Sequence, residues 1–143
     1  MANIIYETYL EAEVLGADPM KLVHLLYRGA TEAVAAARRH LAAGEIRQRS
    51  RQITKCWEIL YELSRSLDQQ RGGEISRRLA GLYGYMQNRL LEANSKQTDA
   101  PLAEVESLLG TLGEAWASVK LPERVVEQSI AEQAVYEPVS CVY

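Results

Sequence analysis

The chain has 143 residues, of which 48% are hydrophobic and 24% charged, a balance typical of a single folded domain. Its 16 basic and 19 acidic residues give a net charge of −3, which argues against a general nucleic-acid binder, because such a protein needs a basic surface. No apolar run approaches the roughly 20 residues of a membrane span, and the first residues lack the basic and apolar regions of a signal peptide. We therefore expect a cytoplasmic protein without membrane insertion.

The first predicted helix has clear signals at both ends. Asp18 suits the N-cap, because its carboxylate accepts hydrogen bonds from free backbone N–H groups, and Pro19 is tolerated in the first turn. The helical pattern continues to about residue 43. Gly44 can then adopt the left-handed backbone conformation that commonly ends a helix.

Three further helices follow with short connections. The second spans about residues 45–67 and ends before the glycine pair at 72–73. The third spans about residues 74–94, and a polar loop covers residues 95–99. Asp99 and Pro101 then start a fourth helix that ends near residue 119.

Apolar residues recur in every one of these segments at the helical period of 3.6, and in the fourth they alternate in steps of three and four as in a coiled coil. Short connections between long helices predict antiparallel neighbours, so the fold class is all-α, an antiparallel four-helix bundle. The residues expected in its core are Met20, Val23, Tyr27, Ala30, Val34, Ala37, Leu41, Ile46, Ile53, Trp57, Leu60, Leu67, Ile75, Leu79, Leu82, Met86, Leu90, Ala93, Leu102, Val105, Leu109, Leu112, Trp116 and Val119.

The two ends of the chain differ from the bundle. Residues 1–16 are weakly helical and rich in apolar side chains, so we expect a cap segment that belongs to one domain of residues 1–119. Residues 120–143 form an acidic tail, either a short helix or disordered. Residues 1–98 hold 14 basic and 11 acidic residues (+3), whereas residues 99–143 hold 2 basic and 8 acidic residues (−6). The tail either lies against the basic part of the bundle or is solvated.

The sequence lacks the patterns that catalysis requires. It has no Glu-x-x-His pair for a di-metal bundle, no Walker A sequence, no G-x-S-x-G and no H-E-x-x-H. The two cysteines, Cys56 and Cys141, have no C-x-x-C spacing for zinc, and Cys56 is expected to be a small buried apolar residue. We predict no enzymatic activity, no metal and no cofactor.

His24 is the one residue that suggests a phosphotransfer bundle as an alternative function. Modules of that kind resemble His-x-Leu-Lys-Gly, and here the basic residue and the glycine of His24-Leu25-Leu26-Tyr27-Arg28-Gly29 each come one position late. One position rotates a side chain by about 100° around a helix, so the cation points elsewhere. A histidine at the boundary of the core is the other interpretation.

A second alternative is a nucleic-acid patch. Residues 38–55 hold six basic residues and one acidic residue, but no aromatic residues interleave to stack on bases. The outer face of the second helix continues as Glu58, Glu62 and Arg65, which is typical of a solvated surface with salt bridges, and this is the other interpretation of the segment.

Two features indicate a binding module. The first helix carries a second apolar stripe beside its core stripe, so its apolar arc is about 200° wide, against roughly 100° for a surface helix. Either this helix lies centrally between two neighbours, or part of its arc receives another polypeptide. In the fourth helix, glycines flank the core seam although each costs roughly 1 kcal/mol relative to alanine, which suggests close approach by a neighbour or a partner helix. The two sets are Leu22, Leu26, Gly29, Ala33 and Ala36, and Gly110, Gly113 and Ala117.

An ordered set of short motifs then makes the chain recognisable. They are Tyr6-x-x-Tyr9, Pro19-x-Lys21-Leu22, Leu26-Tyr27-Arg28-Gly29-Ala30, Ser66-Leu67-Asp68, Gly72-Gly73-Glu74-Ile75, Leu82-Tyr83-Gly84-Tyr85-Met86, Arg89-Leu90-Leu91-Glu92-Ala93-Asn94 and Glu114-Ala115-Trp116. Over about residues 6–119 this set resembles the FliS family of flagellar secretion chaperones. Gly84 departs from the family pattern, which usually has aspartate there, and Thr98 stands where asparagine is common.

The resemblance implies a bundle without enzymatic activity that binds the disordered C-terminal segment of flagellin and prevents premature polymerisation. It also implies help in delivering flagellin to the export gate protein of the type III export apparatus at the membrane. Tyr6 and Tyr9 would belong to a mobile cap beside the binding groove. The expected partner-binding residues are Tyr6, Tyr9, Leu22, Leu26, Gly29, Ala33, Gly110, Gly113 and Ala117. On this interpretation Leu26→Asp weakens flagellin binding at least tenfold, about 1.4 kcal/mol, and leaves the bundle folded.

Overall fold

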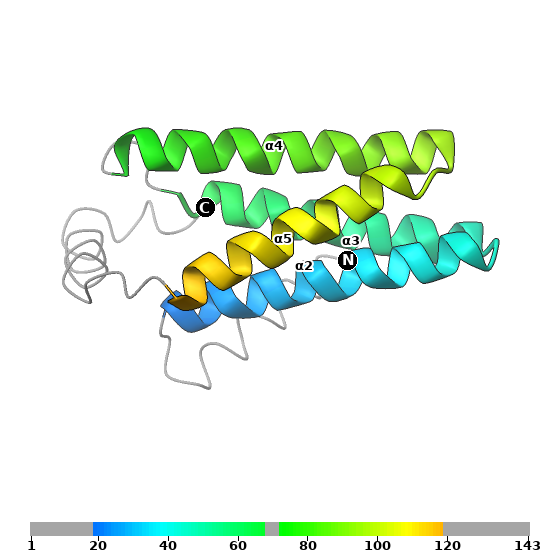
Figure 1. Cartoon of the computed structure of the whole chain (residues 1–143), viewed down its shortest axis with the longest axis horizontal. Coiled ribbons are helices and arrows are strands. Elements are labelled where there is room, and N and C mark those ends of the chain that lie inside the picture. Colours follow the sequence, from blue (N-terminus) through cyan, green and yellow to red (C-terminus); the bar gives the residue numbers. More distant parts are fainter. Residues whose placement is uncertain (1–18, 68–71, 119–143) are drawn as a thin grey trace.

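The computed structural model of the chain describes residues 19–67 and 72–118, which form four helices and no strand (Figure 1). The helices are α2 (Pro19–Ala42), α3 (Ile46–Arg65), α4 (Gly73–Lys96) and α5 (Ala100–Ser118). The predicted all-α bundle is therefore confirmed. The expected cap segment of residues 1–16, Val119 and the tail of residues 120–143 lie outside the described residues.

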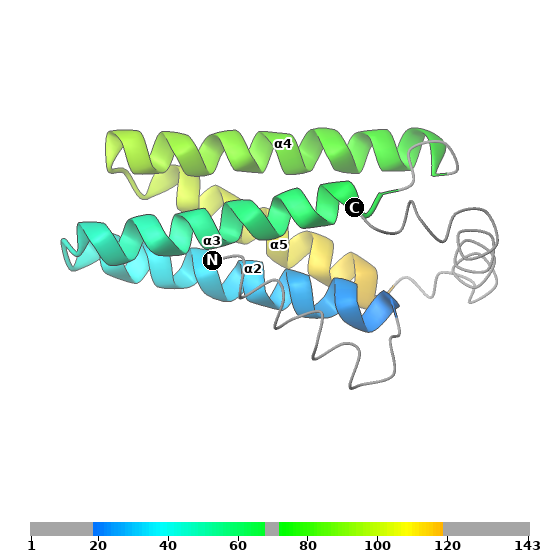
Figure 2. The ribbon, with the colours of Figure 1, turned by 180° about the vertical axis from the view of Figure 1, so that it is seen from behind.

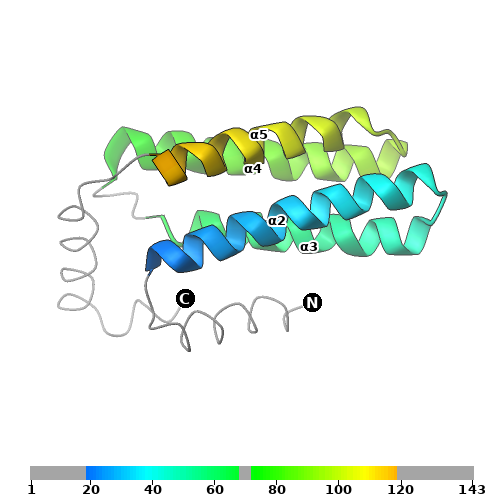
Figure 3. The same ribbon diagram turned by 60° about the horizontal axis from the view of Figure 1, so that its bottom comes forward.

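Each helix runs antiparallel to the next and packs against two others. Contacts join α2 to α3 and α5, and join α4 to the same two helices. The view from behind in Figure 2 shows α3 alongside α2, and Figure 3 shows two layers, α2 with α3 and α4 with α5. In Figure 1, α5 runs obliquely, beginning beside the end of α4 and finishing beside the start of α2. One end of the bundle therefore holds the beginnings of α2 and α4 and the ends of α3 and α5.

The predicted glycine signals are confirmed at two helix ends. At the end of α2, Gly44 has a φ of 73°, the left-handed conformation that glycine adopts most readily. Its N–H bonds the Leu41 carbonyl at 3.1 Å, and the Glu45 N–H bonds the His40 carbonyl at 2.9 Å. This pair of bonds is a Schellman motif, which satisfies carbonyls that the helix leaves free. Gly73, at the start of α4, has a φ of 55°.

The predicted ends of α3 and α4 are wrong by about two residues. The helix α3 ends at Arg65 rather than 67, and α4 continues to Lys96 rather than 94. The chain leaves α4 at Gln97, whose φ of 54° and ψ of 47° are left-handed although it is not glycine. This conformation costs a non-glycine residue roughly 1–2 kcal/mol, so no sequence pattern marks it as a helix end.

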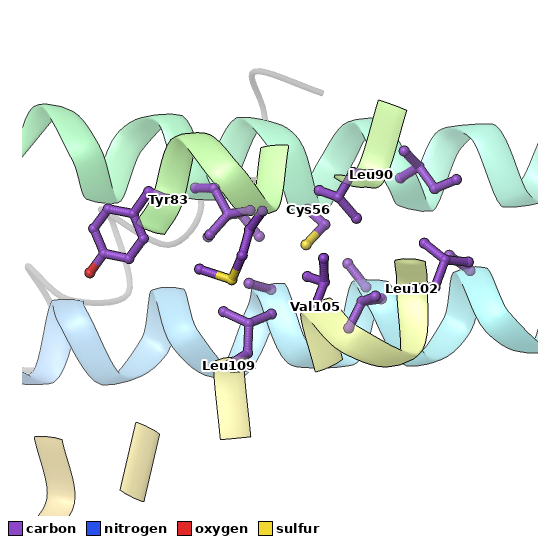
Figure 4. Close-up of a cluster of buried hydrophobic side chains, with 14 of the residues drawn as sticks. Cys56, Tyr83, Leu90, Leu102, Val105 and Leu109 are labelled. Atoms are coloured by element: carbon purple, nitrogen blue, oxygen red, sulfur yellow. The ribbon is translucent and has the colours of Figure 1, made fainter. Parts of the chain in front are cut away.

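The core is built from buried side chains of all four helices (Figure 4), and most of the predicted core residues lie in it. Cys56 is 0% exposed, as expected, and burial raises the pKa of its thiol to about 12. The prediction of core burial is wrong for two residues: Ile46 is 56% exposed and Ile75 is 72% exposed. Each lies in the first turn of its helix, at an end of the bundle, where the facing helices give little cover.

A candidate partner-binding surface

The wide apolar arc of α2 is divided between two neighbouring helices. Leu26 is 2% exposed and Ala33 is 1% exposed, and both belong to the core. A Cβ built on Gly29 would lie 3.3 Å from Cδ1 of Ile59, so this side of α2 faces α3 closely. Leu22 is half-buried against the same core. Of the two interpretations of the arc, a central helix with two neighbours accounts for these residues.

Burial contradicts one expectation about this stripe. A charge at Leu26 cannot leave the bundle folded as predicted, because a 2% exposed side chain has no route to water. The sequence shows how wide an apolar arc is, but it does not show whether the helix that covers the arc belongs to the same chain. Leu22, Leu26, Gly29 and Ala33 therefore lie at the α2–α3 interface or its edge, and their contribution to partner binding stays a prediction.

The second predicted set lies on an open surface. Gly110 and Ala117 are exposed and Gly113 is half-buried. A Cβ built on either glycine would meet no atom of the described residues within 4 Å, so no close neighbour within 19–67 or 72–118 explains why these positions are glycine. At 100° per residue the three residues and Glu106 share an arc of about 60° on α5. We call Gly110, Gly113 and Ala117 the bare strip.

Two polar contacts fix the bare strip beside α2. At one end Arg38 of α2 donates to both carboxylate oxygens of Asp99, at 2.8 and 2.9 Å, and to Glu106 at 2.7 Å. Pairing with this guanidinium lowers the pKa of Asp99. Glu106 lies on the arc of the bare strip, so the strip borders α2. The strip and the Leu26 stripe are consequently on different sides of α2, and the structure does not bring the two predicted sets together.

At the other end of α5 a buried network joins three helices. Trp116 Nε1 donates to the Tyr27 hydroxyl at 3.0 Å, and that hydroxyl lies 2.5 Å from the hydroxyl of Tyr83 in α4. Burial raises the pKa of both tyrosines. The sequence placed Tyr27 and Trp116 in the core but not Tyr83, which is 1% exposed, and it did not predict the hydrogen bonds of the three side chains. The available signal was that Tyr27 and Trp116, two aromatic residues with polar groups, were both expected inside.

The remaining candidate residues are Tyr6, Tyr9 and His24. Tyr6 and Tyr9 lie outside the described residues. His24 is exposed on α2. Within the described part of the chain, no group of three or more potential ligands is arranged to hold a metal ion, and no helix is long and apolar enough to cross a membrane.

Comparisons with known proteins agree with one another. The family model described as flagellar protein FliS matches residues 1–123. The flagellar secretion chaperone FliS of Salmonella typhimurium is 37% identical over 111 residues, which cover 77% of this chain and 82% of that protein. The flagellar secretion chaperone FliSB of Pseudomonas aeruginosa is 36% identical over 77% of this chain and 87% of its own length. FliS of Bacillus subtilis is 29% identical over 83% of this chain and 88% of its own.

Proposed function

Because this chain belongs to the FliS family of flagellar secretion chaperones, we propose that it is a cytoplasmic chaperone for flagellin. It binds the C-terminal segment of flagellin, prevents that segment from polymerising early, and assists delivery to the flagellar type III export apparatus. The export gate protein is the second partner of this proposal. The chaperone names of the relatives point to a binding role without catalysis. The alternative function, phosphotransfer through His24, would make the chain a signalling protein, which is a different class of protein from a secretion chaperone.

The bare strip is the observation that best supports a helical client. A helix interior without side chains lets a second backbone approach closely, and such an approach offsets the cost of the two glycines. No side chain of the described residues comes within 4 Å of a Cβ built on Gly110 or Gly113. A client segment that is disordered when free can fold against such a surface, and the burial of its apolar face offsets the entropy lost on ordering.

The remaining predicted residues take supporting roles in this proposal. Tyr6 and Tyr9 cover the bound client, because an amphipathic tyrosine suits a surface that is apolar on one side and wet on the other. One stripe of α2 packs against α3 and thereby fixes the edge of α2 that borders the bare strip. This stripe consists of Leu22, Leu26, Gly29 and Ala33.

A glycine substitution tests the strip with a matched control. Gly110→Gln places a side chain on the strip, and Gly81→Gln places the same side chain on α4, at an exposed glycine whose Cβ would also meet nothing within 4 Å. Both variants should stay folded and gain up to about 1 kcal/mol in stability, because glutamine favours helix more than glycine does. Only Gly110→Gln should weaken binding of the C-terminal segment of flagellin, by tenfold or more.

The binding surface and the identity of the client can be contradicted separately. Equal affinity of both variants and the unsubstituted chain would show that the strip is not the binding surface. Absence of binding by the folded, unsubstituted chain would contradict flagellin as the client.

A further inference from the structure

The first half of α5 is fixed to the bundle on both sides. Arg38 of α2 pairs with Asp99, which directly precedes the helix, at 2.8 Å and with Glu106 at 2.7 Å. On the opposite side Arg89 of α4 pairs with Glu104 at 2.6 Å. The buried side chains of α5 lie in this half too. Ion pairs and core packing therefore hold the first half of the helix in place.

The second half, residues 110–118, is attached much more weakly, and we call it the α5 flap. None of its residues is buried, and its large apolar side chains, Leu112 and Trp116, are half-buried against the core. The ion pairs that α5 forms with described residues all belong to its first half. One hydrogen bond links the flap to another of the described helices, from Trp116 Nε1 to the Tyr27 hydroxyl at 3.0 Å. In Figure 1 the flap also runs away from α4 and ends beside the start of α2.

Two glycines lie at the point where the attachment changes. Gly110 directly follows the buried Leu109, and Gly113 comes one turn later. Only proline is less favourable than glycine in the interior of a helix. Because a Cβ on either glycine would meet no described neighbour within 4 Å, packing among these helices does not require glycine there. The helix is therefore intrinsically weakest where its contacts with the bundle become fewest.

The acceptor of the linking hydrogen bond is itself firmly held. Tyr27 is 4% exposed, and its hydroxyl lies 2.5 Å from the hydroxyl of Tyr83 in α4. The two rings pack with centroids 6.4 Å apart. Tyr27 is consequently a fixed point of the core, and its bond to Trp116 ties the weakly attached flap to that point.

We propose that the α5 flap opens from the bundle as one unit, with Gly110 and Gly113 as the pivot, and that Tyr27 holds it closed through Trp116. A detached segment this short does not stay helical in water, so opening exposes its backbone amides together. Because Gly113 and Ala117 of the bare strip lie on the flap, opening moves them away from α2 and releases a client seated there. This release rests on the proposed function, whereas the opening itself does not.

Native-state hydrogen exchange of the full-length chain, followed amide by amide by NMR, tests the opening. The amides of residues 112–117 should show nearly equal protection, because one event exposes them all. That protection should lie below the protection of residues 104–109 by about tenfold or more, because the first half of α5 stays bound when the flap opens. Fraying of a helix end predicts instead a protection that falls steadily toward Ser118.

Two tyrosine variants form a matched pair, because each loses one hydroxyl of the same network. Tyr27→Phe removes the acceptor for Trp116 and should speed exchange in the flap about fivefold, the effect of one lost hydrogen bond. Tyr83→Phe leaves that bond in place and should not change exchange in the flap. Both variants should speed exchange of core amides that need global unfolding. If Tyr27→Phe does not fold, Trp116→Phe removes the same bond and should speed exchange in the flap at least as much.

Alanine at the pivot should act in the opposite direction. Gly110→Ala combined with Gly113→Ala should slow exchange in the flap by about tenfold or more, because each alanine favours the helical, closed state. The control is Gly81→Ala combined with Gly84→Ala on α4, where a Cβ also meets no described neighbour within 4 Å. This control should leave exchange in the flap unchanged.

Three results would overturn the proposal. The first is protection that falls steadily along residues 110–118, which would assign the exchange to fraying. The second is an equal effect of Tyr27→Phe and Tyr83→Phe on the flap. The third is a flap whose amides are protected as strongly as those of the core. These measurements use no flagellin, so their failure would leave the proposed function standing, and a failure to bind flagellin would leave the opening standing.

Discussion

The network of Tyr27, Tyr83 and Trp116 predicts an order of stability among phenylalanine variants. Tyr27 is its centre, because its hydroxyl contacts the Tyr83 hydroxyl at 2.5 Å and accepts the Trp116 N–H at 3.0 Å. Tyr83→Phe removes one of these bonds. Tyr27→Phe removes both and leaves the hydroxyl of Tyr83, a residue that is 1% exposed, without this partner.

The magnitudes follow from that difference. Loss of one hydrogen bond costs about 1 kcal/mol, so Tyr83→Phe should lower the free energy of unfolding by about that amount. Tyr27→Phe adds the penalty of roughly 1–3 kcal/mol for a buried polar group left unpaired, a total of about 2–4 kcal/mol. The double variant should be no less stable than Tyr27→Phe, because the second substitution removes the unpaired hydroxyl.

Denaturant unfolding of the single and double variants measures this order directly. Tyr85→Phe is the control, because Tyr85 is 45% exposed and its bond to Glu104 is at the surface, so its cost should stay within about 0.5 kcal/mol. Strictly additive costs, or a larger cost for Tyr83→Phe than for Tyr27→Phe, would refute the assignment of Tyr27 as the centre.

Three further predictions follow from burial and charge. Leu26→Asp should destabilise the bundle by about 4 kcal/mol or more, seen as lost helical circular dichroism, and a normally folded variant would contradict its burial. The Cys56 thiol should react with a thiol reagent at pH 8 only after unfolding, and reaction in the folded state would contradict its 0% exposure. Because Arg38 lowers the pKa of Asp99, their pairing stabilises the fold fully above about pH 4 and is lost as pH falls through the lowered pKa. Asp99→Asn should therefore weaken the dependence of unfolding on pH in acid, and an unchanged dependence would count against the pair.

Local signals in the sequence predicted most of the fold. Gly44 was expected to be left-handed at a helix end, and it is. Gln97 ends α4 in the same conformation without a glycine to mark it, so the boundary there was missed. The helical period identified the apolar side of each helix, but it does not show where neighbouring helices stop, and for that reason Ile46 and Ile75 were wrongly placed in the core.

The candidate site was less predictable, because the residues that form a surface are those that no neighbouring helix packs against. The arcs around Leu26 and Gly110 gave similar signals in the sequence. In the structure, Leu26 is buried in the core, whereas no described residue fills the space beside Gly110. Similarly, nothing in the charge pattern of residues 38–55 distinguished Arg38, which pairs with Asp99 and Glu106, from Arg51, which forms no ion pair with a described residue. Both distinctions come from the packing of the helices.

Calorimetric titration of the full-length chain with the C-terminal segment of flagellin from the same organism, at several temperatures, tests the central proposal most directly. A complex of one chaperone to one segment should form, with a strongly negative heat-capacity change, because apolar surface is buried as a disordered client folds. Absence of binding heat at every temperature, from a chain shown by circular dichroism to be folded, would contradict the assignment of flagellin as the client.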